Sequence, residues 1–137
     1  MTRTTRHFFS AALAAILLSA PACRRGSPPA YVPAAGRVVF TDNTPVAEVK
    51  LLFFPRDQAG ENFPTIPFGM TDKAGKFSVL MGADKPGIPP GRYGVAITPF
   101  SPGAKSKLPA SSGDPATTTV EVVVPAAGST DLTIRVE

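Results

Sequence analysis

Hydrophobic and polar residues alternate in short runs along most of this chain, and Gly, Pro, Asn or Asp separates one run from the next. Alternation with a period of two is typical of β-strands that bury one face, whereas an amphipathic helix places apolar residues three and four positions apart. The sixteen prolines also disfavour long helices. The pattern predicts seven strands, near residues 36–41, 48–54, 68–71, 76–80, 92–98, 118–124 and 131–136.

The alternation also predicts which side chains face the core. The inward sets are Val49, Leu51 and Phe53; Tyr93, Val95 and Ile97; Val120, Val122 and Val124; and Leu132, Ile134 and Val136. A single sheet would leave its apolar face in water, so these sets are expected to pack against one another between two sheets. We therefore expect an all-β fold, a seven-stranded antiparallel two-sheet Greek-key sandwich.

Two of the predicted turns contain an aspartate that can accept hydrogen bonds from the turn amides. Asp42 begins the turn before Pro45, and Asp72 begins the turn that ends at Gly75, which can adopt the positive φ that closes a hairpin. If the two turns met, Asp42 and Asp72 could instead share a calcium ion. Capping of the turn amides is the preferred interpretation, because each carboxylate lies beside amides that it can cap.

The first 22 residues differ from the rest of the chain. Arg3 and Arg6 precede an apolar run, Phe8–Ala20, which would extend about 20 Å as a helix. A hydrocarbon core is about 30 Å thick, so this run is too short to span a membrane and fits the apolar region of a signal peptide. Cleavage is expected between Ala22 and Cys23, which gives a signal peptide at 1–22, a Pro-rich linker at 23–34 and one domain at 35–137.

Cys23 is the only cysteine in the chain, so no intrachain disulfide can explain it. Its place after the expected cleavage site resembles a bacterial lipobox, which predicts an acylated Cys23 that anchors an exported lipoprotein to a membrane of the cell envelope. Ala20, Pro21 and Ala22 also satisfy the rule for ordinary signal peptidase. The alternative is therefore a soluble secreted domain whose first residue is cysteine.

Composition excludes several classes of function. The one histidine, His7, lies in the expected signal peptide, so the mature domain could form neither a histidine-containing zinc site nor a serine triad with a histidine base. The net charge of +4 is low, is spread along the chain and includes Arg3 and Arg6, which does not indicate a nucleic-acid-binding protein. We expect no catalytic residues, no cofactor and no metal. A hydrolase that uses carboxylates alone is the enzymatic alternative.

The order of these segments resembles the carboxypeptidase regulatory-like, transthyretin-like domain found in bacterial envelope lipoproteins. The resemblance rests on the opening strand at 36–38, the turn at 42–45 with Asn43 in place of glycine, the second strand at 49–55, the hairpin at 71–77 and the strand entry at 90–95. It implies a transthyretin-like fold. These motifs are turn and core residues, so they imply no activity.

The segment 62–68 contains three large apolar residues between prolines, Phe63, Ile66 and Phe68. If exposed, they would mark a site for a protein partner, and the alternative is that they fold over the edge of the sandwich. A second loop, 100–117, is rich in Ser, Pro, Gly and Ala. Taken together, the sequence predicts a non-enzymatic, lipid-anchored envelope protein that binds a protein or a polysaccharide. A carbohydrate-binding module that uses Tyr31 or Phe63 is the main alternative.

Overall fold

The computed structural model describes residues 30–57, 65–101 and 107–137. These residues form β-strands and one short 3-10 helix, η1 (Ala110–Gly113). The strands are β1 (Ala34–Phe40), β2 (Val49–Pro55), β3 (Phe68–Met70), β4 (Lys76–Met81), β5 (Lys85–Pro86), β6 (Gly91–Pro99), β7 (Glu121–Val124) and β8 (Ser129–Val136). The prediction of an all-β protein is confirmed.

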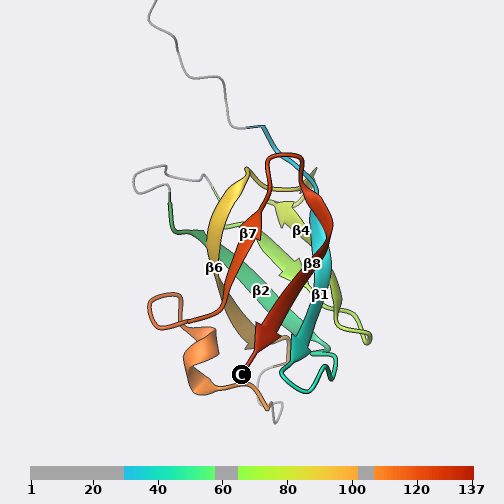
Figure 1. Cartoon of the computed structure of the whole chain (residues 1–137), viewed down its shortest axis with the longest axis vertical. Coiled ribbons are helices and arrows are strands. Elements are labelled where there is room, and N and C mark those ends of the chain that lie inside the picture. Colours follow the sequence, from blue (N-terminus) through green and yellow to red (C-terminus); the bar gives the residue numbers. More distant parts are fainter. Residues whose placement is uncertain (1–29, 58–64, 102–106) are drawn as a thin grey trace, which may run out of the picture.

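The strands form one strongly curved sheet in the order β7-β6-β2-β3-β4-β1-β8, with β5 paired to the end of β4. Figure 1 shows that the curvature brings the two end strands, β7 and β8, side by side, so that the sheet is nearly closed into a barrel. The chain enters at the end of the barrel where β7 turns into β8, and β1, β6 and β8 all run toward the opposite end.

The expectation that every strand pair is antiparallel was wrong for β1 and β8, which pair in parallel from Gly36 opposite Leu132 to Phe40 opposite Val136. Alternation along a strand carries no information about the direction of a neighbour that is almost a hundred residues away, so the sequence pattern could not indicate this pairing. The two backbones approach closely at Gly36, where a Cβ atom would overlap the carbonyl oxygen of Leu132.

Two further details differ from the sequence-based expectation. The strand β5 was not expected, because two residues are too few to show alternation. The strand predicted from residue 118 begins only at Glu121, because the hydroxyl of Thr118 donates a 2.8 Å hydrogen bond to the carbonyl of Val95 and also accepts one from the amide of Val120. Side-chain bonds of this kind replace a ladder bond.

The predicted inward residues form the core, except that Val120 is only partly buried and packs against its rim. Phe53 lies at the centre of the core. The centroid of its ring is 6.2 Å from the ring centroid of Phe77 and 6.3 Å from that of Tyr93. Burying one such side chain contributes about 1.5–3 kcal/mol. The hydroxyl of buried Tyr93 donates a 2.7 Å hydrogen bond to the carbonyl of Pro89, so its polar end is satisfied inside the barrel.

The two aspartate turns form as predicted. Asp72 Oδ1 accepts hydrogen bonds from the amides of Ala74 and Lys76 at 2.8 and 2.9 Å, and Gly75 has a φ of 73°. Asp42 Oδ1 accepts a 2.9 Å bond from the amide of Thr44. Asn43, at the position where the family motif has glycine, has a φ of 66°, a conformation that asparagine tolerates better than most residues.

Candidate functional site

The predicted partner segment leads directly into β3. Pro67 is fully buried, whereas Ile66 on one side of it is 50 % exposed and Phe68 on the other is partly exposed. Met70, two residues further on, is 45 % exposed. Because alternate residues of an extended chain point to the same side, Ile66, Phe68 and Met70 share the outer side of the barrel wall. The segment therefore presents two of its three predicted apolar residues outward, and Phe63 lies outside the described residues.

The strand register extends this apolar surface across four strands. Phe68 lies opposite Leu52 of β2 and opposite Leu80 of β4, and Leu80 lies opposite Pro86 of β5. Leu52 points outward because Leu51 and Phe53, on either side of it, face the core. We call the outer side of β2 to β5 the partner face, which is formed by Leu52, Phe54, Ile66, Phe68, Met70, Leu80 and Pro86.

One cation lies within the partner face. The Nζ atom of Lys50 is 5.8 Å from the centre of the Phe68 ring, and Lys50 pairs with Met70 across the β2–β3 ladder. A lysine over an aromatic face gains a modest electrostatic attraction, and its aliphatic stem covers apolar surface. The partner face is thus mostly apolar, with a positive charge at one corner.

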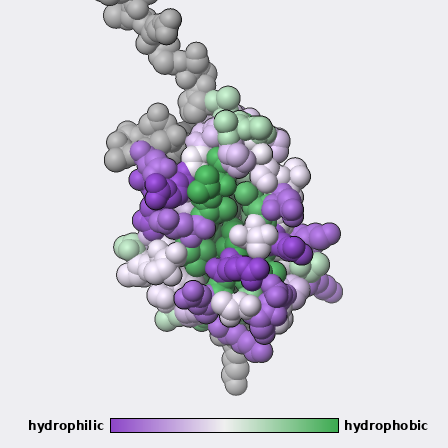
Figure 2. Space-filling view, viewed as in Figure 1, coloured by the Kyte–Doolittle hydropathy of each residue, from purple (hydrophilic) through white to green (hydrophobic). Residues whose placement is uncertain are grey.

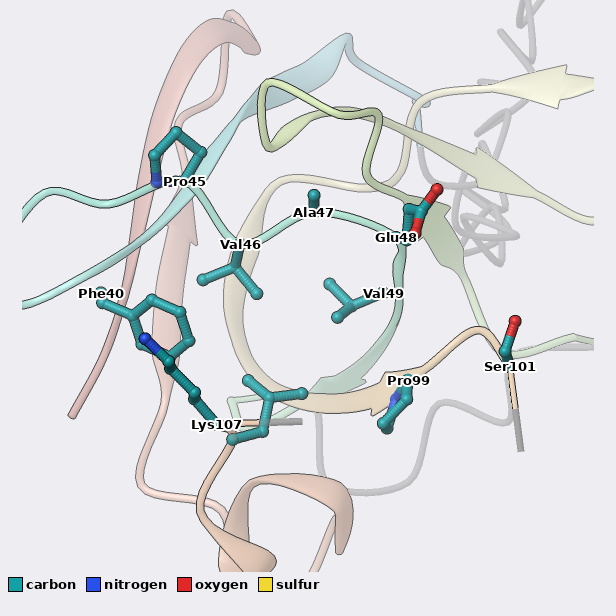
Figure 3. Close-up of a pocket in the computed structure, with 10 residues that line it drawn as sticks. Phe40, Pro45, Val46, Ala47, Glu48, Val49, Pro99, Ser101 and Lys107 are labelled. Carbon is teal, nitrogen blue, oxygen red and sulfur yellow. The ribbon is translucent and has the colours of Figure 1, made fainter. Parts of the chain in front are cut away.

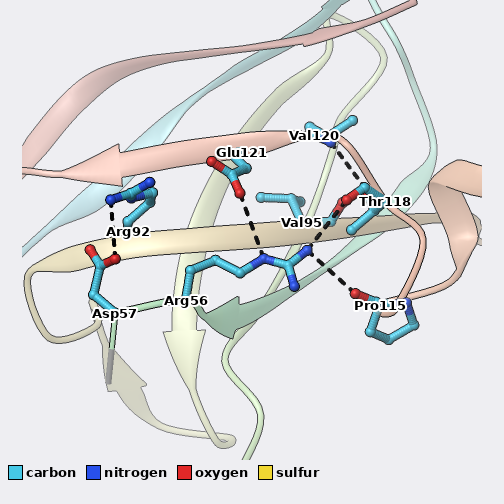
Figure 4. Close-up of polar contacts among 8 residues, drawn as sticks. All are labelled: Arg56, Asp57, Arg92, Val95, Pro115, Thr118, Val120 and Glu121. Atoms are coloured by element: carbon cyan, nitrogen blue, oxygen red, sulfur yellow. Dashed lines mark hydrogen bonds and ion pairs between the residues drawn. The ribbon is translucent and has the colours of Figure 1, made fainter. Parts of the chain in front are cut away.

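The barrel wall beside the partner face is covered by the chain itself. Arg56, just after β2, lies over β6, where a Cβ atom on Gly94 would be 2.5 Å from its guanidinium nitrogens. Its Nη2 atom donates to the carbonyls of Pro115 and Thr118 at 3.4 and 3.3 Å, and its Nε atom lies 3.8 Å from Glu121 Oε1 (Figure 4). These contacts hold the segment before β7 against β6.

The described part of the second predicted loop, 107–117, is folded onto the barrel. It contains η1, whose Ser112 is buried, and Asp114, whose carboxylate accepts a 2.8 Å hydrogen bond from the amide of Ala116. A Cβ atom on Gly113 would be in van der Waals contact with Thr98 of β6. This segment therefore closes one side of the partner face and leaves β2 to β5 uncovered by residues of the described ranges.

A hollow of about 260 Å³ lies at the end of the barrel where β1 and β6 finish and β2 begins. Val46 and Val49 point into it, the carboxylate of Glu48 points away from it, and Lys107 reaches across toward Phe40 (Figure 3). Glu48 has a φ of 55°, which is strained for this residue type, and its carbonyl accepts a 2.9 Å hydrogen bond from the amide of Phe100. The hollow has both polar and apolar walls, and it does not bring its two charged groups, Glu48 and Lys107, together.

Apolar surface is also visible on the opposite side of the molecule. Figure 2 shows it in the centre of that face, over β7 and beside the gap to β8. Val123 of β7 is 63 % exposed, but its neighbours Val122 and Val124 are buried in the core. A single exposed valine is ordinary for a protein surface, so Val123 offers a comparison position rather than a second site.

The described residues contain no group of three or more His, Cys, Asp or Glu side chains placed to hold a metal ion. The pKa of Asp42 is lowered, first by a hydrogen bond from the Thr44 hydroxyl and then by one from the Thr44 amide. Both bonds belong to the turn that Asp42 caps, so this carboxylate has a structural role.

The other predicted site residues divide into two groups. Ala22 and Cys23, the expected cleavage and lipidation positions, lie outside the described residues. Tyr93 is buried in the core and Tyr31 is 40 % exposed beside the Val32–Ile88 bridge, where the chain joins the barrel. Of the helical residues in the described ranges, none forms a helix long and apolar enough to cross a membrane.

Sequence reasoning predicted only Ile66 and Phe68 of the partner face and missed its other five members, Leu52, Phe54, Met70, Leu80 and Pro86. Leu52, Leu80 and Pro86 join Phe68 only through the pairing and register of their strands, which the sequence pattern does not give. Comparison with known protein families, with curated proteins and with solved structures finds no match to this chain.

Proposed function

We propose that this chain is an exported, lipid-anchored protein without enzymatic activity that binds a protein partner through the partner face. The observation that carries the proposal is the cross-strand row of Leu52, Phe68 and Leu80 on the outer wall, flanked by the exposed Ile66 and Met70. Isolated exposed apolar residues are common, but a contiguous group of seven, three of them exposed and four partly exposed, is typical of interaction sites.

The partner face has the composition of a protein-binding surface. It combines aromatic and methionine side chains, which are enriched in interfaces, with one cation at its corner, Lys50. Its centre is held by strand pairing, because Leu52, Phe68 and Leu80 each lie on a strand that pairs with a neighbour on both sides. A rigid surface loses little conformational entropy on binding.

The location is proposed from the sequence. The positive residues, short apolar run and small residues of 1–22 support export, and Cys23 directly after them supports acylation. Residues 23–34 would then connect the lipid anchor to the barrel. Stable attachment needs more than one acyl chain, which triacylation of Cys23 would supply.

The finer fold that we propose is the transthyretin-like Greek-key sandwich. In its support, β2, β3 and β4 are consecutive neighbours and β1 lies beside β4, which is a Greek-key order read in reverse. The bond from the Tyr93 hydroxyl at the start of β6 to the carbonyl of Pro89 resembles the tyrosine corner of Greek-key sandwiches. The segment 71–77, the most specific motif of the family resemblance, forms the expected turn into β4.

Two experiments test this proposal. Mass spectrometry of the N-terminus and membrane fractionation, each with wild-type and Cys23→Ala chains, test the anchor. Wild-type protein is expected in the membrane fraction with an acylated Cys23, and the variant is expected to be released. Equal membrane recovery of both chains would overturn the lipid anchor.

The partner is tested by purifying tagged chain from its own membranes with three sequences: wild type, Met70→Glu and Val123→Glu. The two substitutions each place one charge at an exposed apolar position, so the second is a matched control. We expect a stoichiometric protein with wild type and Val123→Glu, and its loss with Met70→Glu. If Met70→Glu retains the same protein as wild type, binding through the partner face is refuted.

Carbohydrate binding is the second candidate, because Tyr31 exposes 40 % of its surface and could stack on a sugar ring. A pull-down assay with cell-envelope polysaccharide distinguishes carbohydrate binding from protein binding. Retention by the polysaccharide that is lost in Tyr31→Ala would favour a carbohydrate-binding module over a protein-binding one.

A further inference from the structure

A group of basic side chains lies on the outer side of β1, β8 and the start of β4, and none of them is among the seven residues of the partner face. Arg37 of β1 lies directly opposite Lys76 of β4 in an antiparallel register, and opposite Thr133 of β8 in the parallel one. Val39 lies opposite Arg135 in the same parallel ladder. Since Val38 and Ile134 face the core, Arg37 and Arg135 face solvent on the same side of the sheet.

The pairing of Arg37 with Lys76 is electrostatically unfavourable. Like charges directly opposite each other in neighbouring strands destabilise a sheet. Within the described ranges, neither side chain forms an ion pair, and neither do the exposed acids nearest to them in and directly after β8, Asp131 and Glu137. A cost of this kind, left without a compensating acid, is expected where the charges serve a ligand.

Arg37 and Arg135 line a common hollow of about 360 Å³ together with Val39, Asn43 and Thr133. The Nη1 atom of Arg135 donates a 3.1 Å hydrogen bond to Asn43 Oδ1, which orients that guanidinium group toward the turn after β1. Its other N–H groups remain for a ligand. Val39 is only 6 % exposed, so the floor of the hollow is apolar and its walls are basic and polar.

We infer that this hollow, the arginine hollow, binds a phosphate group. Two guanidinium groups match the oxygens of a tetrahedral anion, because each presents several N–H donors in a planar fork. The hydroxyl of Thr133 supplies a further donor, and Lys76 adds positive charge beside it. The ligand is a small or polymer-borne phosphate that enters the hollow.

The phosphate of a membrane lipid is a less suitable source. Proteins that bind anionic membranes by a surface usually combine basic residues with exposed large apolar side chains that enter the lipid. The exposed large apolar residues of the described ranges are Tyr31, Ile66, Met70, Phe100 and Val123, and none of them belongs to β1, β8 or the first half of β4. The arginine hollow shares no residue with the partner face, so the phosphate site and the protein-binding site can be tested separately.

An NMR titration tests this inference. Inorganic phosphate or pyrophosphate is added to the full-length, ¹⁵N-labelled chain, and the arginine Nε–Hε signals are recorded at each concentration. We expect saturable shifts at Arg37 and Arg135. Arg37→Gln and Arg135→Gln should each weaken pyrophosphate binding about ten- to a hundredfold, since a hydrogen bond to a charged group is lost. Lys85→Gln removes an equal charge from β5 and should leave affinity unchanged, and the dispersion of the amide signals verifies that each variant is folded.

Asn43→Gly provides a more specific variant. Glycine keeps the positive φ of the turn but lacks the Oδ1 atom that holds Arg135, so we expect binding that is a few-fold weaker with the fold unchanged. Chemical shifts that grow without saturation would overturn the inference. So would a loss of pyrophosphate affinity in Lys85→Gln as large as the loss in the arginine variants. Binding to phosphatidylglycerol vesicles without binding to pyrophosphate would also overturn it, by assigning the basic residues to a membrane surface.

Discussion

Leu52 and Phe68 lie directly opposite each other on the outer wall of the barrel, although they are sixteen positions apart in the sequence. Each points away from the core, yet each is partly shielded by the other and by its neighbours in the cross-strand row. The pair therefore stands at the centre of the partner face. Leu52 and Phe68 face outward because the alternate positions of β2 and the adjoining segment point inward and belong to the core.

The fold depends on which face of each strand is apolar. Ile134→Asp places a charge at a site that is 1 % exposed, and we expect the domain not to fold, because an unpaired buried charge costs more than the few kcal/mol that stabilise a typical domain. Thr133→Asp, one residue earlier but facing outward, should fold. Circular dichroism and amide dispersion in NMR spectra distinguish these results, and a folded Ile134→Asp chain would contradict the assigned core.

The hydroxyl of Tyr93 should contribute measurably to stability. Tyr93→Phe keeps the ring in the core but leaves the carbonyl of Pro89 without this donor, so we expect a loss of about 1–2 kcal/mol in the free energy of unfolding. Urea denaturation measures the loss, with Tyr31→Phe as the control at an exposed position. Equal stability of the two variants would show that the bond to Pro89 contributes nothing.

The close approach of β1 and β8 requires glycine at position 36. In Gly36→Ala the new methyl group would overlap the backbone of Leu132, so we expect the two strands to separate or shift, with a loss of several kcal/mol in stability. Gly113→Ala adds the same methyl group at ordinary contact distance from Thr98 and should be tolerated. Thermal unfolding of both variants is the measurement, and equal melting temperatures would rule out the close approach.

The Asp42 turn should respond to acid. Because hydrogen bonds from Thr44 lower the pKa of Asp42 in the folded chain, the ionised form is favoured by folding. This contribution is present above the ordinary pKa of 3.8 and is lost as the pH falls through the lower, folded value. The ¹³Cγ resonance of Asp42 should titrate below that ordinary value. In Thr44→Ala, which removes the hydroxyl donor, the midpoint should move upward, and an unmoved midpoint would contradict the assigned cause.

The local features of this fold could be predicted from the sequence. Alternation located the strands and identified Leu51, Phe53 and Ile134 as core residues, and the Asp72 turn followed from the hydrogen-bonding ability of aspartate and the freedom of Gly75. These predictions need only neighbouring residues. The parallel pairing of β1 with β8 and the short strand β5 depend on contacts between distant segments, which alternation does not encode.

The candidate site could be predicted only in part for the same reason. The apolar residues between prolines indicated Ile66 and Phe68, but Leu80 and Pro86 join them only through the β3–β4 and β4–β5 registers. The basic residues of the arginine hollow are scattered along the sequence, and the parallel ladder brings Arg37 and Arg135 to one side of the barrel. Their proximity is a property of topology and not of any sequence motif.

Site-specific photo-cross-linking in intact cells tests the central claim most directly. A photoreactive phenylalanine derivative replaces Met70 in one full-length chain and Val123 in another, since both positions are exposed and lie on different faces. We predict one discrete cross-linked protein from position 70, absent from position 123 and lost when Ile66→Asp is added to the first chain. No cross-link from position 70, or the same products from both positions, would contradict binding of a protein partner through this face.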